Sequence, residues 1–451
     1  MLTAYGMVTT ARTASRRSSI ANLGAILATT GVIPEEDEAD FQLIAEKLQQ
    51  VFDSMAILSV QDLTLGLYLL AARHQRLGDN DNIDGVRVQD PNLVKSLKQD
   101  CLYADAAYLE TVEQICEKSG LTMEDVRVFH QVSKPFQPSH YLAVDSKNEC
   151  VLLVVRGTFS AFDIVTDLTA VSEPFVSGYA HSGMLQAARW LKDAVSSKLQ
   201  ETMKQHPGFS LKVIGHSLGA GTAALLTFLL RSSPEFLVVV PPKKVSCVAF
   251  ATPPVFSREL AEACQGFITT VVLQDDVVPR CSLANLRDLQ LEALYTDIGE
   301  DLPEDHQAKT LLLSITKARE YASATSKEFE AFQGQLDKKV EGYKPFTPIG
   351  EGLKKMYLEK RAQSGRRKLE ASQQADPVVI TAERLKNMPE ENTPLFAPGC
   401  LLQLVRSEGG TTFIQGGRGY HFTRIILSPT MVTDHLTDNY LGCLEDVLSK
   451  I

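Results

Sequence analysis

The sequence predicts an α/β protein built on a mostly parallel sheet that helices cover on both faces. Short strand-like runs alternate with helical stretches from residue 126 onward, which is typical of such a sheet. The run 150–155, CVLLVV, is continuously apolar, as expected of a strand buried on both faces. The pentapeptide Gly215–Gly219, GHSLG, follows the apolar run 211–214 and precedes a helical pattern over 220–230, so it lies on a strand-to-helix turn.

Composition limits the class of protein. A chain of 451 residues can form one or two domains with a large core. Its formal charge of −10 argues against a general nucleic-acid binder. Eight cysteines are too sparse for a disulfide framework, and Cys150, Cys247 and Cys400 are expected to be reduced core residues. The sequence contains no C-x-x-C pair or His/Cys cluster with zinc spacing, so we expect no structural metal.

The N-terminal residues give the only targeting signal. The first 19 residues contain three arginines and no acid, and a weakly apolar stretch follows over 20–33. This pattern is compatible with a transit peptide or a weak signal sequence, but it favours a disordered start over 1–35. No apolar run is long enough to cross a bilayer. We therefore expect a cytoplasmic protein or one peripheral on membranes, with a plastid as the alternative if the start is a transit peptide.

The elements follow from apolar spacing, taken in chain order. Helical periodicity predicts a lead-in over 36–125 that packs on the next domain. Its helical runs are 41–52, 63–77, 93–108 and 112–118. Strands are predicted at 126–129, 141–144, 150–155, 211–214, 245–250, 268–273, 401–405 and 422–427.

A charged, helical segment over 282–392 interrupts this alternation. Its apolar residues recur at near-heptad spacing from Leu311 to Val340, which indicates one packed helix face. A basic run between Lys354 and Lys368 follows. A solvated helix face is the favoured interpretation of that run, and binding of anionic lipid headgroups is the alternative.

Ser217 is the candidate nucleophile. A G-x-S-x-G turn between strand and helix holds its serine in a strained conformation with the hydroxyl above the sheet. Gly215 and Gly219 are small enough to let strand and helix approach each other. Neighbouring side chains on a sharp turn diverge, so His216 is expected to pack rather than to serve as the base.

The partners of Ser217 should lie at the carboxyl ends of the strands. Asp275 and Asp276 both follow the strand 268–273, and either carboxylate fits the position that orients a base. Among the later histidines, His306 lies in the charged segment and His421 lies at the amino end of the strand predicted at 422–427. His435 follows that strand and is the one candidate that the geometry allows.

A developing oxyanion needs hydrogen-bond donors aimed at it. The backbone N–H of Leu218 follows the nucleophile directly. Gly157 and Thr158 come after the strand 150–155, where the glycine allows a close backbone approach. Thr158 also offers its hydroxyl, although an ordinary turn is an equally good interpretation of this tripeptide, Arg156–Thr158.

These residues resemble the class 3 (fungal-type) lipases of the α/β-hydrolase fold, and more closely the sn-1-specific diacylglycerol lipases. The similar segments are Val155–Ser160 with Asp163, Thr166–Leu168, His181–Met184, Gly215–Gly221, Asp276–Arg280, Leu395–Gly399, and Asp434–His435 with Asp438. The helical stretch 62–75 resembles the segment that precedes the catalytic domain of diacylglycerol lipases. The segments occur in the family's order over most of the chain.

The resemblance implies site residues and domains. It implies Ser217 as nucleophile, Asp276 rather than Asp275 as the acid, His435 as base, and Thr158 with Leu218 as the oxyanion hole. It also implies a lid in the loop after Thr158, which includes the apolar pair in 173–178. The expected organisation is a lead-in at 36–125, an α/β-hydrolase catalytic domain at 126–281 and 393–451, and a helical insertion at 282–392 between the acid and the base.

The expected function is hydrolysis of an acyl ester of a glycerolipid, with diacylglycerol favoured by the resemblance alone. The expected partners are the glycerolipid substrate and a membrane or lipid-droplet surface, and no cofactor is needed for this chemistry. Animal diacylglycerol lipases carry transmembrane helices ahead of this region, so the chain is expected to be a soluble relative or an incomplete product. A phospholipase A1 or galactolipase, and a catalytically silent partner-binding protein with the same fold, are the alternatives.

Overall fold

The computed structural model describes residues 81–158, 172–295, 394–416 and 422–451, with a few residues between 67 and 78. Contacts divide the chain into one unit of residues 1–79 and 287–382 and another of residues 80–286 and 383–451. Residues 80–125 of the predicted lead-in fall in the same unit as the sheet, and the predicted domain boundaries stay a prediction. Several predicted features lie outside the described residues: the start at 1–35, the run 41–52, His306, His421 and the basic run 354–368.

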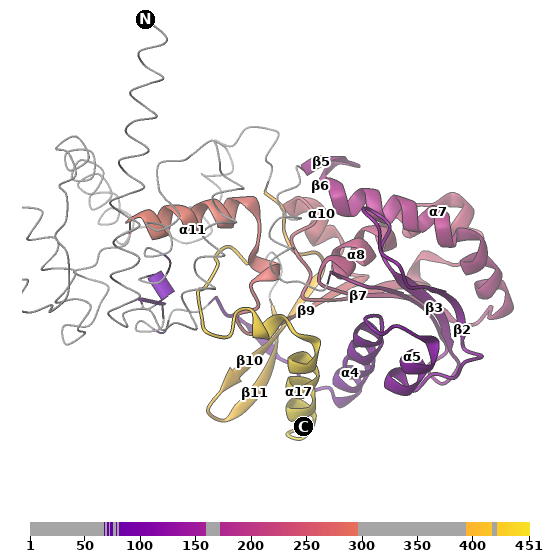
Figure 1. Ribbon diagram of the computed structural model, residues 1–451, viewed down its shortest axis with the longest axis horizontal. Coiled ribbons are helices and arrows are strands. Elements are labelled where there is room, and N and C mark those ends of the chain that lie inside the picture. Colours follow the sequence, from indigo (N-terminus) through magenta and orange to yellow (C-terminus); the bar gives the residue numbers. More distant parts are fainter. Residues whose placement is uncertain are drawn as a thin grey trace, which may run out of the picture. The chain divides into compact units, whose positions relative to one another are not determined.

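One large sheet organises the second unit (Figure 1). From edge to edge, the nine strands described are β1 (Gly85–Arg87), β11 (Gly410–Gly416), β10 (Cys400–Ser407), β9 (Ile268–Leu273), β8 (Val245–Phe250), β7 (Ser210–His216), β4 (Cys150–Val155), β3 (His140–Asp145) and β2 (Val126–His130). A separate hairpin consists of β5 (Ser172–Phe175) and β6 (Gly178–His181).

The centre of the sheet is parallel and its edges are antiparallel. Strands β10, β9, β8, β7 and β4 pair in parallel, whereas β3, β2, β11 and β1 pair antiparallel to their neighbours. In the register, Val155 pairs with Gly215, and Gly215 pairs with Ala249. The carboxyl ends of the central strands therefore meet at one edge, and the strands predicted between 126 and 405 are confirmed.

Helices cover both faces of the sheet (Figure 1). Helices α4 (Pro91–Ala106), α5 (Val112–Ser119) and α17 (Thr437–Leu448) lie on one face, and α7 (Ser182–Gln205), α8 (Leu218–Arg231) and α10 (Arg258–Ala263) lie on the other. The remaining helical elements are α9 (Pro234–Leu237), η2 (Pro242–Lys244), η3 (Val278–Arg280), α11 (Leu283–Tyr295) and η5 (Thr433–His435). Local signals set the helix starts: Asp90 caps α4, and Thr111 with Gln114 forms a capping box on α5.

The strand predicted at 422–427 is wrong. Residues 422–427 are described without strand pairing, although Phe422 and 425–427 are buried. The sheet position beyond β10 is instead taken by β11, and β1 pairs on its far side. The apolar run 422–427 is therefore buried by packing and not as a paired strand of the sheet. An apolar pattern alone does not distinguish these two forms of burial.

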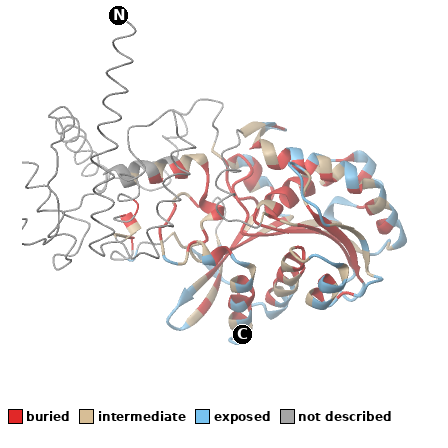
Figure 2. Ribbon diagram, viewed as in Figure 1, coloured by how far each residue is buried: buried red, intermediate tan, exposed pale blue. Residues whose placement is uncertain are grey.

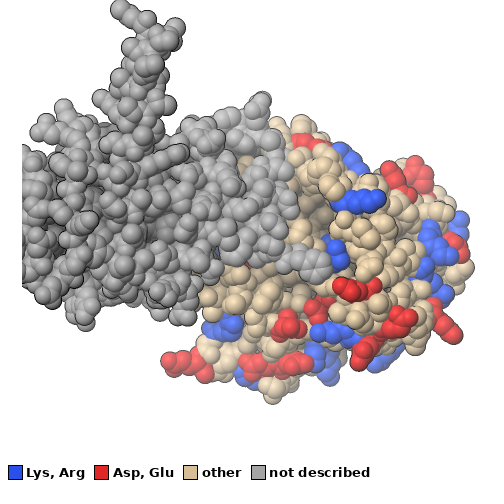
Figure 3. Space-filling model, in the orientation of Figure 1, with Lys and Arg blue, Asp and Glu red and all other residues tan. Residues whose placement is uncertain are grey.

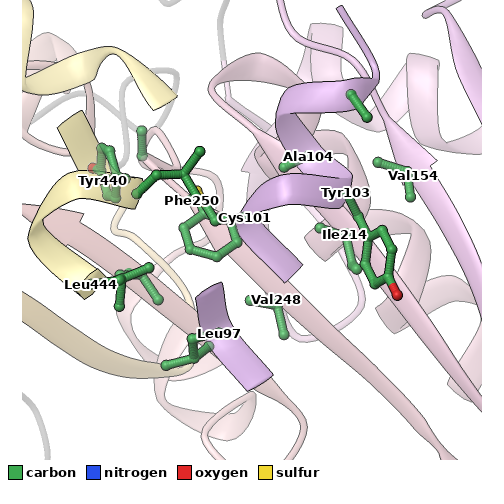
Figure 4. Packing of buried hydrophobic residues seen from close by; sticks show 14 of the residues in the cluster. Leu97, Cys101, Tyr103, Ala104, Val154, Ile214, Val248, Phe250, Tyr440 and Leu444 are labelled. Atoms are coloured by element: carbon green, nitrogen blue, oxygen red, sulfur yellow. The ribbon is translucent and has the colours of Figure 1, made fainter. Parts of the chain in front are cut away.

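The core joins α4 and α17 on one face of the sheet (Figure 4). Leu97 and Cys101 of α4 and Tyr440 and Leu444 of α17 pack with Phe250 of β8 in one buried cluster. Figure 2 shows the central strands almost entirely buried and the helices buried on their sheet side. The packing of α17 therefore fixes the segment that precedes it, which contains η5.

The described surface and cysteines have no special chemistry. All eight cysteines are free, with Cys150 and Cys247 buried and Cys400 half-buried. On the face shown in Figure 3, basic and acidic side chains are interspersed over the described part. No helix in the described ranges is both long and apolar enough to cross a membrane.

A prediction concerns the contact of α17 with the core. Leu444→Ala should lower the free energy of unfolding by about 2–5 kcal/mol, because the side chain is fully buried and its loss leaves a cavity. Urea unfolding monitored by circular dichroism measures this. Glu445→Gln, on the exposed side of the same helix, is the control. It removes only a solvent-exposed ion pair with Lys98 and should shift stability by less than about 1 kcal/mol. Equal effects of the two variants would contradict the described orientation of α17.

Candidate active site

Ser217 lies on a tight turn between β7 and α8. Its backbone has φ 61° and ψ −134°, a strained conformation for a residue with a side chain. A Cβ atom on Gly215 would lie 2.4 Å from the carbonyl oxygen of Gly219, and one on Gly219 would lie 2.3 Å from that of Val155. Both positions therefore require glycine, and the predicted strand, turn and helix are confirmed.

His435 lies between Ser217 and Asp276. Its Nε2 is 3.0 Å from Ser217 Oγ, and its Nδ1 is 3.1 and 3.3 Å from the two carboxylate oxygens of Asp276. All three side chains are buried. A carboxylate only accepts hydrogen bonds, so Nδ1 carries the proton of the neutral ring and Nε2 accepts the hydrogen of the serine hydroxyl.

Of the two adjacent carboxylates, Asp276 contacts His435. Asp276 also accepts hydrogen bonds from Tyr440 Oη at 2.7 Å and from the Val278 N–H at 3.0 Å. Burial opposes its ionisation, but His435 and these hydrogen bonds outweigh burial and hold the pKa of Asp276 below its usual range. Asp275 makes no hydrogen bond to His435 in the described part of the chain, and its backbone N–H donates to Asp434 Oδ2 at 3.1 Å.

The loop Arg156–Thr158, which follows β4, approaches the turn that carries Ser217. A Cβ atom on Gly157 would lie 3.0 Å from Ser217 Cβ and 2.6 Å from the carbonyl oxygen of His216. Only glycine allows this approach. Thr158 is next in the chain, and Leu218 is the first residue of α8, where backbone N–H groups point away from the helix. The structure thus brings both predicted donor segments to Ser217, and their role stays a prediction.

Buried polar contacts tie the loops of this site together. Arg280 is fully buried and donates to the carbonyl oxygens of Asp276 at 2.8 Å and Gln274 at 3.0 Å. The Arg280 guanidinium lies 4.3 Å from the ring centre of Phe422, in the segment predicted as a strand. Asp434, next to His435, pairs with Arg406. These contacts hold the loop after β9 and the η5 segment in one arrangement.

His216 has a larger part in the site than packing. Its Nδ1 is 2.8 Å from Tyr108 Oη, and its Nε2 is 2.8 Å from the backbone oxygen of His435. Burial, followed by the adjacent His435, lowers the pKa of His216 to about 3, so its ring is neutral at ordinary pH. The sequence did not reveal Tyr108 or Tyr440, because each contacts residues that are far away in the chain and belongs to no short motif.

The lid expected after Thr158 is described only in part, because residues 159–171 lie outside the described residues. The apolar pair in 173–178 lies at the β5–β6 turn. Phe175 is buried against Phe228 and Phe256, with ring centres 5.3 and 6.0 Å away. Val176 at the tip is 74% exposed. One member of the pair thus anchors the hairpin and the other faces outward.

The arrangement is able to carry out nucleophilic chemistry. A neutral imidazole beside Ser217 Oγ can remove the hydroxyl proton as the oxygen attacks, and Asp276 can stabilise the imidazolium that forms. No His, Cys, Asp or Glu group suited to a metal ion occurs among the described residues.

Comparison with known proteins shows what this chain is similar to. Residues 152–286 match the family model described as lipase (class 3). Mouse diacylglycerol lipase-beta is 26% identical over 354 residues, which cover 74% of this chain and 48% of the mouse protein. Human diacylglycerol lipase-alpha is 27% identical over 348 residues, which cover 70% of this chain and 28% of the human protein. The secreted mono- and diacylglycerol lipase A of Penicillium cyclopium is 32% identical over 160 residues, which cover 34% of this chain and 50% of the fungal protein.

The chain therefore spans about half the length of the mouse relative and less of the human one. The match to the class 3 lipase family covers β4 to the start of α11, including Ser217 and Asp276. Together with the sheet topology, it confirms the predicted α/β-hydrolase fold and the predicted resemblance.

Reaction with a fluorophosphonate probe tests whether Ser217 is activated. The wild type should be labelled, Ser217→Ala should not, and His435→Ala should be labelled at least about 10³-fold more slowly, because the serine then has no base. In-gel fluorescence over time gives the rates. Labelling of Ser217→Ala at the wild-type rate would show that another residue is the reactive nucleophile.

The buried neutral His216 makes stability depend on pH. Its pKa is about 3 in the folded chain and about 6.5 in an unfolded one, so the unfolded state binds more protons between these values. The stabilisation is complete above about pH 6.5 and falls by up to about 1.4 kcal/mol per pH unit below it.

Wild type should therefore lose more unfolding free energy between pH 7 and pH 4.5 than His216→Gln does. Urea titrations at the two pH values give the difference, with His206→Gln, outside the site, as the control. The groups that face His216, namely His435, Asp276, Asp105 and Tyr108, are the same in all three proteins. Parallel losses in wild type and His216→Gln would show that His216 is not buried in its neutral form.

Proposed function

Because residues 152–286 carry a class 3 lipase domain, we propose that this chain is a serine hydrolase that cleaves an acyl ester of a glycerolipid, with diacylglycerol as the favoured substrate. The single observation that carries the proposal is the buried contact of His435 with both Ser217 Oγ and Asp276. The similarity to proteins named diacylglycerol lipases supports the choice of substrate.

The reaction proceeds through an acyl-enzyme. Ser217 Oγ attacks the ester carbonyl while His435 Nε2 takes its proton, and the oxyanion accepts hydrogen bonds from the Leu218 N–H and from Thr158. Collapse of this intermediate breaks the bond to the glycerol oxygen, which receives the proton from His435. A water molecule, deprotonated by His435, then attacks the acyl carbon. His435 returns this proton to Ser217 Oγ as the bond between the acyl carbon and Ser217 Oγ breaks, which releases the fatty acid and restores free Ser217.

Asp276 and its partners make this sequence of proton transfers possible. The carboxylate keeps the imidazole oriented with Nδ1–H toward it and favours the charged ring that forms twice in each cycle. The hydrogen bonds from Tyr440 and Val278 to Asp276 keep the carboxylate itself ionised and fixed. This part of the mechanism needs only side chains of this chain.

Glycerolipids of this kind reside in lipid surfaces, so we propose that the chain acts peripherally on a membrane or lipid droplet. Two exposed apolar side chains support this: Val176 at the hairpin tip is 74% exposed, and Leu436, next to His435, is 53% exposed. Selectivity for the sn-1 position is part of the proposal and rests on the resemblance to diacylglycerol lipases.

Product analysis on vesicles tests the proposal. Wild-type protein should release fatty acid from phosphatidylcholine vesicles that contain 1-stearoyl-2-arachidonoylglycerol, and mass spectrometry of the remaining monoacylglycerol gives the position cleaved. Ser217→Ala and Asp276→Asn should lose at least about 10³-fold in rate, because each removes a group that acts in the transition state. Asp275→Asn is the matched control and should stay near wild type, since Asp275 does not contact His435.

Parallel vesicles of phosphatidylcholine alone and of monogalactosyldiacylglycerol distinguish the other lipases. Faster release from either lipid than from diacylglycerol would replace the proposed substrate by a phospholipid or a galactolipid. No Ser217-dependent release from any of the three would overturn the proposed activity in favour of a partner-binding protein.

A further inference from the structure

A chain of hydrogen bonds links the loop after β4 to the segment that carries His435. Tyr108 Oη lies 2.8 Å from His216 Nδ1, and His216 Nε2 lies 2.8 Å from the backbone oxygen of His435. A carbonyl oxygen only accepts, so Nε2 carries the proton and Nδ1 accepts the hydrogen of the Tyr108 hydroxyl. The Gly157 N–H makes a hydrogen bond to Tyr108 Oη, which completes the chain.

We propose that Tyr108 and His216 are positioning residues that hold the oxyanion loop at Gly157 and the base His435 in register on either side of Ser217. The inference rests on the proposed function, because it assigns these residues to the hydrolysis at Ser217. Neither residue is hydrogen-bonded to Ser217 Oγ or to a ring nitrogen of His435. They act through the backbone positions that they bridge and through the packing of His216 against the His435 ring.

The three segments that the bridge joins have independent origins in the fold. Tyr108 follows α4, His216 ends β7, and His435 ends η5. A Cβ atom on Gly157 would lie 2.7 Å from Tyr108 Oη and 3.0 Å from Ser217 Cβ, so the hydroxyl and the Ser217 side chain both lie against the side of Gly157 where a side chain would project. A shift of the loop would therefore move an oxyanion donor relative to Ser217.

His216 constrains the base in two ways. It donates to the main-chain oxygen of His435, and its ring packs against the His435 ring with centres 4.7 Å apart and planes inclined by 37°. The first contact fixes the position of the His435 main chain, and the second limits rotation of the His435 side chain. Misplacement of reacting groups by about 1 Å costs up to about 10²-fold in rate, so such constraints bear directly on catalysis.

A packing role alone does not explain this arrangement. His216 and His435 are buried and Tyr108 is half-buried, and burial of such polar groups is unfavourable unless each has its partner. Apolar side chains of similar shape would fill the same space without that cost. The bridge therefore serves geometry at Ser217, and it should show itself in turnover more than in stability or in substrate binding.

Kinetics with the soluble ester p-nitrophenyl butyrate test the inference. Tyr108→Phe, which loses only the hydroxyl, should lower kcat about 10-fold with KM within about twofold, since positioning acts on the transition state. His216→Phe should lower kcat about 100-fold, and His216→Gln, which keeps a donor toward the His435 oxygen, should recover most of that loss. The double variant Tyr108→Phe/His216→Phe should be no slower than His216→Phe, because the bridge acts as a unit.

Tyr103→Phe is the matched control. Tyr103 is a buried tyrosine of α4, and its hydroxyl donates to Asp145 Oδ2 at 2.7 Å, away from Ser217. This variant should lose as much thermal stability as Tyr108→Phe and keep the wild-type kcat. Wild-type kcat in Tyr108→Phe, an equal loss in Tyr103→Phe, or multiplying losses in the double variant would overturn the inference. If His216→Phe does not fold, Tyr108→Phe and His216→Gln still decide.

The same variants separate this inference from the proposed function. Fluorophosphonate labelling of Ser217 needs the aligned site but no glycerolipid. Wild type that is labelled faster than Tyr108→Phe yet releases no fatty acid from any vesicle supports the bridge and overturns the lipase activity. Wild type that cleaves diacylglycerol while Tyr108→Phe and His216→Phe match it in every rate overturns the bridge alone.

Discussion

The imidazole of His435 makes a hydrogen bond on each side, to Ser217 Oγ at 3.0 Å and to Asp276 at 3.1 Å, and the rest of the site depends on this double contact. Ser217, Asp276 and His435 belong to segments that are far apart in the sequence. Hydrogen bonds form only within a narrow range of distance and angle, so these segments have to be held in fixed positions. Parallel pairing of the central strands brings their carboxyl ends to one edge, and the packing of α17 on α4 fixes the approach of η5.

A buried polar site is stable only when its groups have partners. The Tyr440 hydroxyl and the Val278 N–H donate hydrogen bonds to the Asp276 carboxylate. Arg280 donates hydrogen bonds to the carbonyl oxygens of the same loop. The strained backbone of Ser217 persists for a related reason, since a hydrogen bond from its N–H to Phe250 and the glycines at 215 and 219 leave the turn no alternative. Stability and preorganisation therefore have the same physical origin here.

Much of this could be predicted from residues alone, because periodicity and turn chemistry are local. The central strands, α4, α5, α8 and the turn at Ser217 follow from them. The position of His435 was also predicted, yet part of that reasoning used a strand at 422–427 that does not exist. The position of Asp275 and Asp276 after the same strand does not show which of them orients the base, and the hydrogen bond of the Asp276 carboxylate to His435 distinguishes them. Tyr108, Tyr440 and the contacts of His216 arise from tertiary packing, which no short pattern encodes.

The parallel pairing of β9 with β10, which aligns Leu273 with Leu404, has a consequence for how such a chain can vary. The pairing holds the two ends of residues 274–399 on adjacent strands, so the polypeptide between them forms a closed loop whatever its sequence or length. The entropic penalty of closing a loop rises only with the logarithm of its length. Between residues 295 and 394, insertions or deletions can therefore accumulate at small energetic cost, and new regulatory sequence can be acquired there while Asp276 keeps its distance from His435 and Ser217.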